Sequence, residues 1–162
     1  MTAIEHRVVH ANGIRIHLAE CGEGPVVLMV HGFPESWYSW RHQLPALASA
    51  GYRAVAMDVR GYGRSSKPSA VADYRMVLMV ADVVGLAGVL SNDSGREPIT
   101  LVGHDWGAPT VWHSALMRPD LFRGVAGLSV PYSPPGGAVP PLAGMRAMAG
   151  EDHEFYIEYF AI

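Results

Sequence analysis

One stretch decides the expected fold of this chain: Ile99-Thr100-Leu101-Val102-Gly103-His104-Asp105-Trp106-Gly107. A short apolar run with β character ends at one glycine, and a second glycine opens a segment that reads as a helix. A strand that turns so tightly into a helix tolerates only small flanking residues, and the side chain between them is forced outward. The pattern therefore predicts that Gly103 and Gly107 support a nucleophile elbow that displays Asp105.

An aspartate at this position suits one kind of chemistry. A carboxylate is already ionised at neutral pH, so it needs no activating base before it attacks. Attack on an sp³ carbon that bears a leaving group gives an alkyl ester of the protein, which water must then hydrolyse. The alternative is an ordinary corner in which Asp105 caps the following helix. We favour the nucleophile, because both flanking glycines are present.

Composition narrows the class of protein. A chain of 162 residues with 49% hydrophobic and 17% charged residues predicts one globular domain with a sizeable core. The net charge of -3 provides no basic surface for nucleic acid or for a membrane. The single cysteine, Cys21, rules out an internal disulfide framework. The N-terminus lacks a signal-peptide pattern, and no run approaches the length of a membrane span, so we expect a soluble cytoplasmic protein.

Two patterns that suggest metal or cofactor binding fail on inspection. His6 and His10 are four apart, but in a strand they lie too far apart to share an ion, so we expect no metal. Gly61 and Gly63 follow a strand, but Ser66 stands where a dinucleotide-binding loop needs its third glycine. We therefore expect no cofactor.

The order of elements predicts an α/β fold with a mostly parallel, doubly wound sheet. Residues 6–19 read as an antiparallel hairpin with Asn12-Gly13 at its turn. Strands and helices then alternate, which favours parallel pairing with helices on both faces. The expected strands are 26–30, 52–57, 99–103 and 125–130, and the expected helices are 40–48, 73–90 and 108–117. From Pro131 the proline- and glycine-rich sequence leaves the sheet.

Three signals together resemble one family. They are the elbow, the His31-Gly32 pair after a strand, and Asp58-x-Arg60-Gly61-x-Gly63-x-Ser65 after the next strand. The combination resembles the α/β-hydrolase fold, and residues 31–40 and 103–107 are similar to the corresponding segments of epoxide hydrolases. The resemblance implies that residues 1–132 are the N-terminal part of the hydrolase core and that residues 133–162 begin a cap domain.

The resemblance also implies roles for individual residues. Asp105 matches the nucleophile that opens the epoxide, and the backbone N–H groups of Phe33 and Trp106 match the oxyanion hole. The supporting residues are His31, Gly32, Pro34, Gly103 and Gly107; His31 is expected to brace the Phe33 loop rather than to transfer protons. Phe33, Trp37 and Trp106 are expected to line an apolar substrate pocket.

Tyr156 is a further residue implied by the resemblance. Phe155-Tyr156-Ile157-Glu158-Tyr159-Phe160 is similar to a segment near the start of the family's cap, in which the first tyrosine donates a hydrogen bond to the epoxide oxygen. A phenol suits this task because it donates without being charged. The alternative is a packed aromatic cluster on a cap helix.

The chain departs from the family pattern at its end. The general-base histidine, its acid partner and the second cap tyrosine lie beyond the cap in that family, and the sequence stops at Ile162. We expect the fold to be truncated before the last strands, with residues 125–130 at an open edge. Residues 1–162 alone are expected to fold poorly or to associate, and to form an ester without turning over.

Three functions remain open at this point. The first is an epoxide hydrolase that converts a small apolar epoxide to a vicinal diol. The second is a haloalkane or haloacetate dehalogenase with the same nucleophile, although Phe33 offers no side-chain donor for a halide and Trp106 offers no charge for a carboxylate. The third is a non-catalytic remnant that binds a ligand or a partner chain. Homo-oligomerisation is left open.

Overall fold

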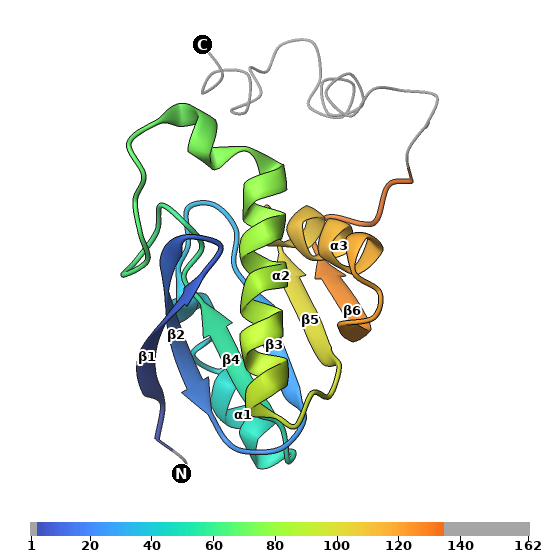
Figure 1. The fold of residues 1–162 in the computed structure, drawn as a ribbon. Coiled ribbons are helices and arrows are strands. Elements are labelled where there is room, and N and C mark those ends of the chain that lie inside the picture. The colour runs from blue at the N-terminus through green and yellow to red at the C-terminus, as the bar shows by residue number, and fades with distance from the viewer. Residues whose placement is uncertain (1–2, 135–162) are drawn as a thin grey trace, which may run out of the picture. The chain divides into compact units, whose positions relative to one another are not determined.

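The structure is a computed structural model that describes residues 3–134. Within this range the chain forms one six-stranded sheet with the strand order β1-β2-β4-β3-β5-β6 (Figure 1). The strands are β1 (Glu5–Ala11), β2 (Ile14–Cys21), β3 (Val26–Val30), β4 (Arg53–Met57), β5 (Ile99–His104) and β6 (Phe122–Leu128). The helices are η1 (Trp37–Trp40), α1 (Gln43–Ser49), η2 (Val71–Tyr74), α2 (Met76–Asp93) and α3 (Gly107–Met117).

The sheet confirms the predicted fold class. β1 and β2 form the antiparallel hairpin, and both turn residues, Asn12 and Gly13, have positive φ, as a tight hairpin turn requires. β2 also pairs antiparallel with β4, whereas the β4–β3, β3–β5 and β5–β6 pairs are parallel. The parallel strands all end at one edge of the sheet, so the residues that follow them gather there.

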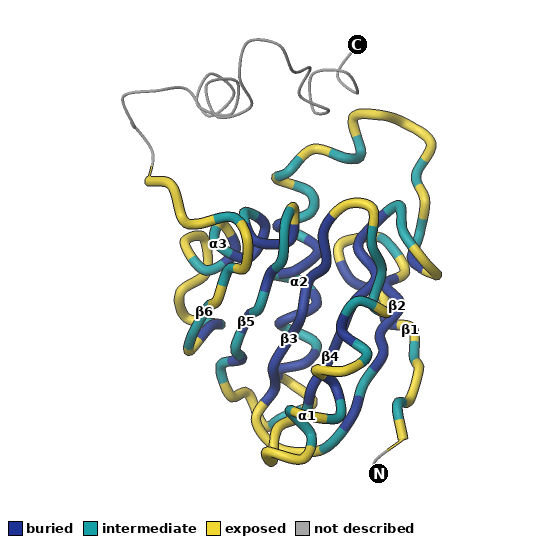
Figure 2. The backbone as a smooth tube through the Cα atoms, turned by 180° about the vertical axis from the view of Figure 1, so that it is seen from behind, coloured by how far each residue is buried: buried dark blue, intermediate teal, exposed yellow. Residues whose placement is uncertain are grey.

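Helices cover both faces of the sheet, with α2 and α3 on one face and α1 on the other (Figures 1 and 2). All five residues of β3 are buried, as expected for a central strand packed on both sides. Alternate strand residues face the larger core, where Val83, Leu86 and Leu90 of α2 and Val111 of α3 pack. The other residues face a smaller core with Trp40 and Leu44 from η1 and α1. The elbow is therefore held between two packed layers.

Three predicted starts differ from the structure by three residues. The helix expected from residue 40 begins at Gln43, after the short helix η1. The helix expected from residue 73 begins at Met76, and the short turn η2 precedes it. Arg60 Nη1 donates to the carbonyl oxygen of Asp73 at 2.6 Å and occupies the acceptor that a continuous helix would use. The last strand begins at Phe122 rather than Val125, because Phe122 pairs with Ile99 at the start of β5. β6 ends at Leu128 and forms one edge of the described sheet.

A buried ion pair fixes α2 to the segment after β4. Arg60 binds Asp82 through two contacts, Nε to Oδ2 at 2.6 Å and Nη2 to Oδ1 at 2.7 Å, and both side chains are almost fully buried. Asn12 of the hairpin turn also donates to Asp82, at 2.8 Å. A bidentate pair with extra donors satisfies the buried charges, which would otherwise be costly to desolvate. This pair sets the position of the α2 N-terminus near the elbow.

The expectation that no run approaches the length of a membrane span is wrong. α2 has 18 residues with a mean hydropathy of 1.5. In the structure, however, Val80, Val83, Leu86 and Leu90 of this helix are buried in the protein core. This apolar helix therefore packs on one face of the sheet.

Candidate active site

The elbow has the shape that its sequence predicts. β5 ends at His104, α3 begins at Gly107, and Asp105 between them has a φ of 51°. A Cβ on Gly103 would collide with the carbonyl of Gly107, and a Cβ on Gly107 would collide with the carbonyl of Val30. Only glycine fits at these two positions, because backbone lies where the side chain would be. Asp105 is left partly exposed at the carboxyl edge of the sheet.

The loop after β3 meets the nucleophile from the opposite side. The Phe33 N–H donates to Asp105 Oδ1 at 2.9 Å. Gly32 permits this contact, since a Cβ there would collide with the Asp105 carboxylate, and the peptide between Phe33 and Pro34 is cis. Among residues 3–134, the Trp106 N–H has no recorded acceptor, which leaves a second amide at the base of Asp105. Oδ1 of Asp105 thus accepts from the Phe33 amide, and the Trp106 amide is the next residue along the chain.

His31 connects this loop to the end of β4. Its Nε2 accepts from the Val59 N–H at 3.0 Å, so the proton of the neutral ring lies on Nδ1, which bonds the Gly32 carbonyl at 2.8 Å. Burial lowers the pKa of His31 below its usual 6.5, which keeps the ring neutral. Both nitrogens are therefore engaged with backbone next to the Phe33 amide.

Glu35 is a site residue to which the sequence analysis gave no role. Its Oε2 accepts from the Gly32 N–H at 3.2 Å and lies 3.2 Å from His104 Nδ1. Glu35 therefore bridges the loop after β3 and the residue that precedes Asp105. The signal was present, because Glu35 lies in the same run as His31 and Gly32. Its partner His104 could not be deduced, since 69 residues separate the two in sequence.

A cavity of about 270 Å³ opens beside the elbow, and we call it the side cavity. Phe33 and Trp106, which are 41% and 40% exposed, contribute to its lining. The remaining lining residues are His31, Gly32, Val59, Tyr62, Tyr74, Met76, Met79 and Thr110. Trp37 is not among them. Its ring packs edge-on against His6 at 4.8 Å and His17 at 6.4 Å between centroids, so its predicted role in substrate binding stays a prediction.

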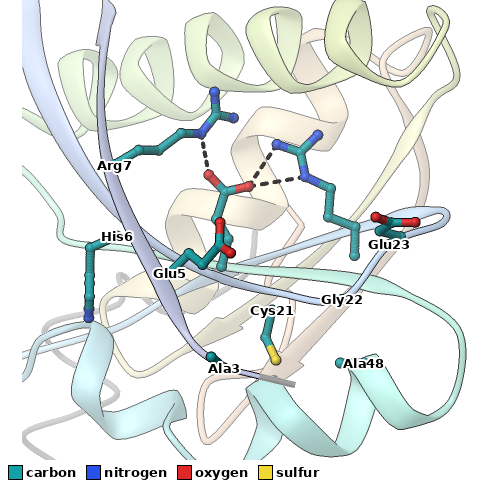
Figure 3. Close-up of a pocket in the computed structure, with 10 residues that line it drawn as sticks. Ala3, Glu5, His6, Arg7, Cys21, Gly22, Glu23 and Ala48 are labelled. Carbon is teal, nitrogen blue, oxygen red and sulfur yellow. Dashed lines mark hydrogen bonds and ion pairs between the residues drawn. The ribbon is translucent and has the colours of Figure 1, made fainter. Parts of the chain in front are cut away.

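A larger hollow of about 610 Å³ lies over β1 and β2 and shares no lining residue with the side cavity (Figure 3). Three of its charged groups form ion pairs, because Arg7 and Arg53 both contact Glu20. Such paired charges on a partly exposed surface stabilise local structure. None of the residues of the elbow lines this hollow. We therefore place the candidate site beside the smaller cavity, whose lining includes Phe33, the hydrogen-bond donor to Asp105, and Trp106, the next residue after it.

A buried aspartate, Asp58, directly follows β4 and was not singled out for chemistry. Its carboxylate accepts from the N–H groups of Trp37 and Arg64, both at 2.9 Å, and from His17 Nδ1 at 2.8 Å. His17 Nε2 in turn lies 3.1 Å from His6 Nδ1. These contacts join β1, β2, η1 and the segment after β4. Among the described residues, no group of three or more His, Cys, Asp or Glu side chains is arranged to hold a metal ion.

Tyr156 and the rest of the expected cap segment lie outside the described residues. The structure thus brings Asp105 together with Gly32, Phe33 and Trp106, and places His31 directly behind them. Gly103 and Gly107 form the turn itself, and Pro34 follows Phe33 in the loop.

A strand-to-helix turn that displays an aspartate on a sheet of this order defines an α/β hydrolase. A family model described as the alpha/beta hydrolase fold matches residues 25–149, more than half of the chain. The chain therefore belongs to the α/β-hydrolase fold family.

Its relatives in this family are epoxide hydrolases. Epoxide hydrolase A of Mycobacterium tuberculosis is 49% identical over 162 residues, which cover 99% of this chain and 48% of that protein. Epoxide hydrolase 3 of Siraitia grosvenorii is 46% identical, over 100% of this chain and 49% of that protein. The chain therefore spans about half the length of the curated relatives that it matches.

Solved structures agree with these sequence matches. An epoxide hydrolase from an endophytic Streptomyces has a TM-score of 0.85 at 57% identity, over 98% of this chain and 46% of that chain. The epoxide hydrolase of Vigna radiata has a TM-score of 0.84 at 50% identity, over 97% of this chain and 47% of that chain.

Proposed function

We propose that this chain carries the nucleophile half of an epoxide hydrolase, in which Asp105 attacks a carbon of an apolar epoxide. The observation that carries the proposal is the contact between the Phe33 N–H and Asp105 Oδ1 at 2.9 Å. With Oδ1 held, Oδ2 is the oxygen that attacks, and the C–O bond of the epoxide breaks as the ester bond forms. The former epoxide oxygen becomes an alkoxide, which must be protonated.

The second half of the proposed reaction returns the carboxylate. Water attacks the ester carbonyl, and negative charge develops on Oδ1, where the Phe33 amide already donates. The Trp106 amide is the proposed second donor. The proposed donor to the alkoxide is Tyr156, on the resemblance of its segment alone. The expected product is a vicinal diol, and no metal or cofactor takes part in the proposed steps.

Formation of the ester tests this function, because it needs only Asp105 and the groups around it. The chain would be incubated with styrene oxide, digested and analysed by mass spectrometry. We expect the peptide that contains Asp105 to gain the mass of one epoxide. Loss of this adduct in Asp105→Asn, with retention in a variant of the exposed Asp120, would localise the reaction.

A dehalogenase is the competing function with the same nucleophile. The structure places the Phe33 side chain, which has no hydrogen-bond donor, in the lining of the side cavity. We therefore expect no chloride release from a chloroalkane under conditions that give the epoxide adduct. Chloride release without an epoxide adduct would overturn the proposal in favour of a dehalogenase.

A further inference from the structure

The side cavity is lined mainly by apolar side chains that do not belong to the elbow. Met76 and Met79 lie three residues apart at the start of α2, so they share one face of the helix, and both line the cavity. Tyr62 and Tyr74 add two aromatic rings from the segment after β4. The lining is therefore dominated by large, apolar and partly flexible side chains.

The polar groups of the lining are largely engaged elsewhere. The Tyr74 hydroxyl donates to the Pro68 carbonyl at 2.7 Å, and the Thr110 hydroxyl donates to the Trp106 carbonyl at 2.9 Å. Both ring nitrogens of His31 bind backbone. In the described part of the chain, the Tyr62 hydroxyl has no recorded hydrogen bond, so it is the one uncommitted hydroxyl of the lining. A group that enters this cavity gains mainly apolar contact.

The cavity is joined to the reaction centre through its lining. Gly32 and Phe33 border it on the side of the loop after β3, and Trp106 borders it on the side of the elbow. The Phe33 N–H donates to Asp105 Oδ1 at 2.9 Å, so this border of the cavity directly contacts the proposed nucleophile. A substituent on the attacked epoxide can therefore extend from Asp105 into the cavity.

We infer that the side cavity is a specificity subsite that takes the apolar substituent of the epoxide, with Met76 and Met79 as its adjustable wall. This inference rests on the proposed function. The volume of about 270 Å³ suits an aryl ring or a short alkyl arm. The thioether side chains adapt to different shapes, so the subsite selects for apolar character and size rather than for one outline.

The test is a ratio of two rates measured on the same protein. Ester formation on Asp105 is followed by mass spectrometry with styrene oxide, which has a phenyl arm, and with propylene oxide, which has a methyl arm. The ratio cancels any loss of folded protein, because both rates fall equally when fewer molecules are folded. Met79→Phe fills the cavity, and Val77→Phe is the control, since Val77 lies on the same helix and is 54% exposed.

We expect Met79→Phe to lower the styrene oxide to propylene oxide ratio by roughly 10- to 100-fold, the range for one misfitting apolar group in a pocket. Val77→Phe should leave the ratio unchanged, and Met79→Ala should shift it toward epoxides with larger arms. An unchanged ratio in both Met79 variants would overturn the subsite while ester formation still supports the proposed function. If the parent chain forms no ester with styrene oxide and none with propylene oxide, both the subsite and the proposed function are overturned.

Discussion

Two aspartates follow parallel strands that end at the same edge of the sheet, with β3 between the two strands, and their surroundings differ in burial and in hydrogen bonding. Asp58, after β4, is fully buried and accepts three hydrogen bonds, from Trp37, Arg64 and His17. Asp105, after β5, is partly exposed and accepts one recorded bond, from Phe33. A buried carboxylate that accepts three hydrogen bonds fixes the groups around it, whereas a carboxylate with one oxygen not hydrogen-bonded is available to attack carbon.

Burial and hydrogen bonding, rather than residue type or place in the sheet, therefore separate the structural carboxylate from the proposed nucleophile. At the elbow, Asp105 has a positive φ, and among the described residues its carboxylate accepts a hydrogen bond from the Phe33 N–H alone.

The largest effect is expected where the free oxygen is removed. Asp105→Asn replaces the attacking oxygen with an amide, which is a poor nucleophile at carbon. We expect ester formation with styrene oxide to fall by at least about 10⁴-fold, in the range found when a nucleophile is deleted. Thermal unfolding should change little, because Asp105 holds only one recorded hydrogen bond. An equal loss of stability would remove the distinction between the two aspartates.

A substitution at Asp58 tests the role of the buried carboxylate. Asp58→Asn leaves donors facing an amide nitrogen in a buried site, and we expect the free energy of unfolding to fall by about 3 kcal/mol. Ester formation per folded molecule should persist. Urea denaturation and the adduct assay measure the two quantities, and Asp120→Asn on the exposed surface is the control with no expected change in either.

Gly32 tests the approach of the loop to the nucleophile. An alanine there would place a Cβ on the Asp105 carboxylate and displace the Phe33 N–H. We expect ester formation to fall about 100-fold, the cost of a misplacement near 1 Å. Gly88→Ala is the matched control, because no atom lies within 4 Å of its added Cβ and the helix α2 should gain about 0.5–1 kcal/mol. Comparable losses in both variants would contradict a specific role for Gly32.

The smallest effect concerns pH and the support behind the site. Burial lowers the pKa of His31 in the folded protein below its usual 6.5, so the unfolded chain binds a proton more readily. The contribution of neutral His31 to stability is therefore present above pH 6.5 and is lost as the pH falls through this value toward the lower folded pKa. Melting temperatures from pH 8 to pH 5 should fall more steeply for the parent than for His31→Asn. Parallel curves would exclude His31 as the source.

The sequence predicted the hairpin, the alternation of strands and helices, and the elbow, because each depends on local patterns. Asn12-Gly13 specifies its own turn, and the two glycines around Asp105 specify theirs. The start of α2 was predicted too early, since Arg60 captures the Asp73 carbonyl from a different part of the chain. Local propensity carries no information about such a contact.

The partners of the site residues were harder to predict for the same reason. Glu35 meets His104 across 69 positions, and His17 meets Asp58 across 41. His17 and Asp58 come from strands whose antiparallel pairing brings them together. Such pairs follow from the strand order, which the periodicity of each strand does not specify.

The strand order also bears on synthesis of the chain. Strands β1 to β4 form a continuous sheet before β5 has been made, and its free edge is β3, whose five residues are all buried in the final fold. Until Ile99–His104 emerges, the nascent chain exposes an apolar edge that can pair with another chain. We expect a translation product that stops before residue 99 to aggregate and one that includes β5 and β6 to be more soluble, which sedimentation of both products would measure.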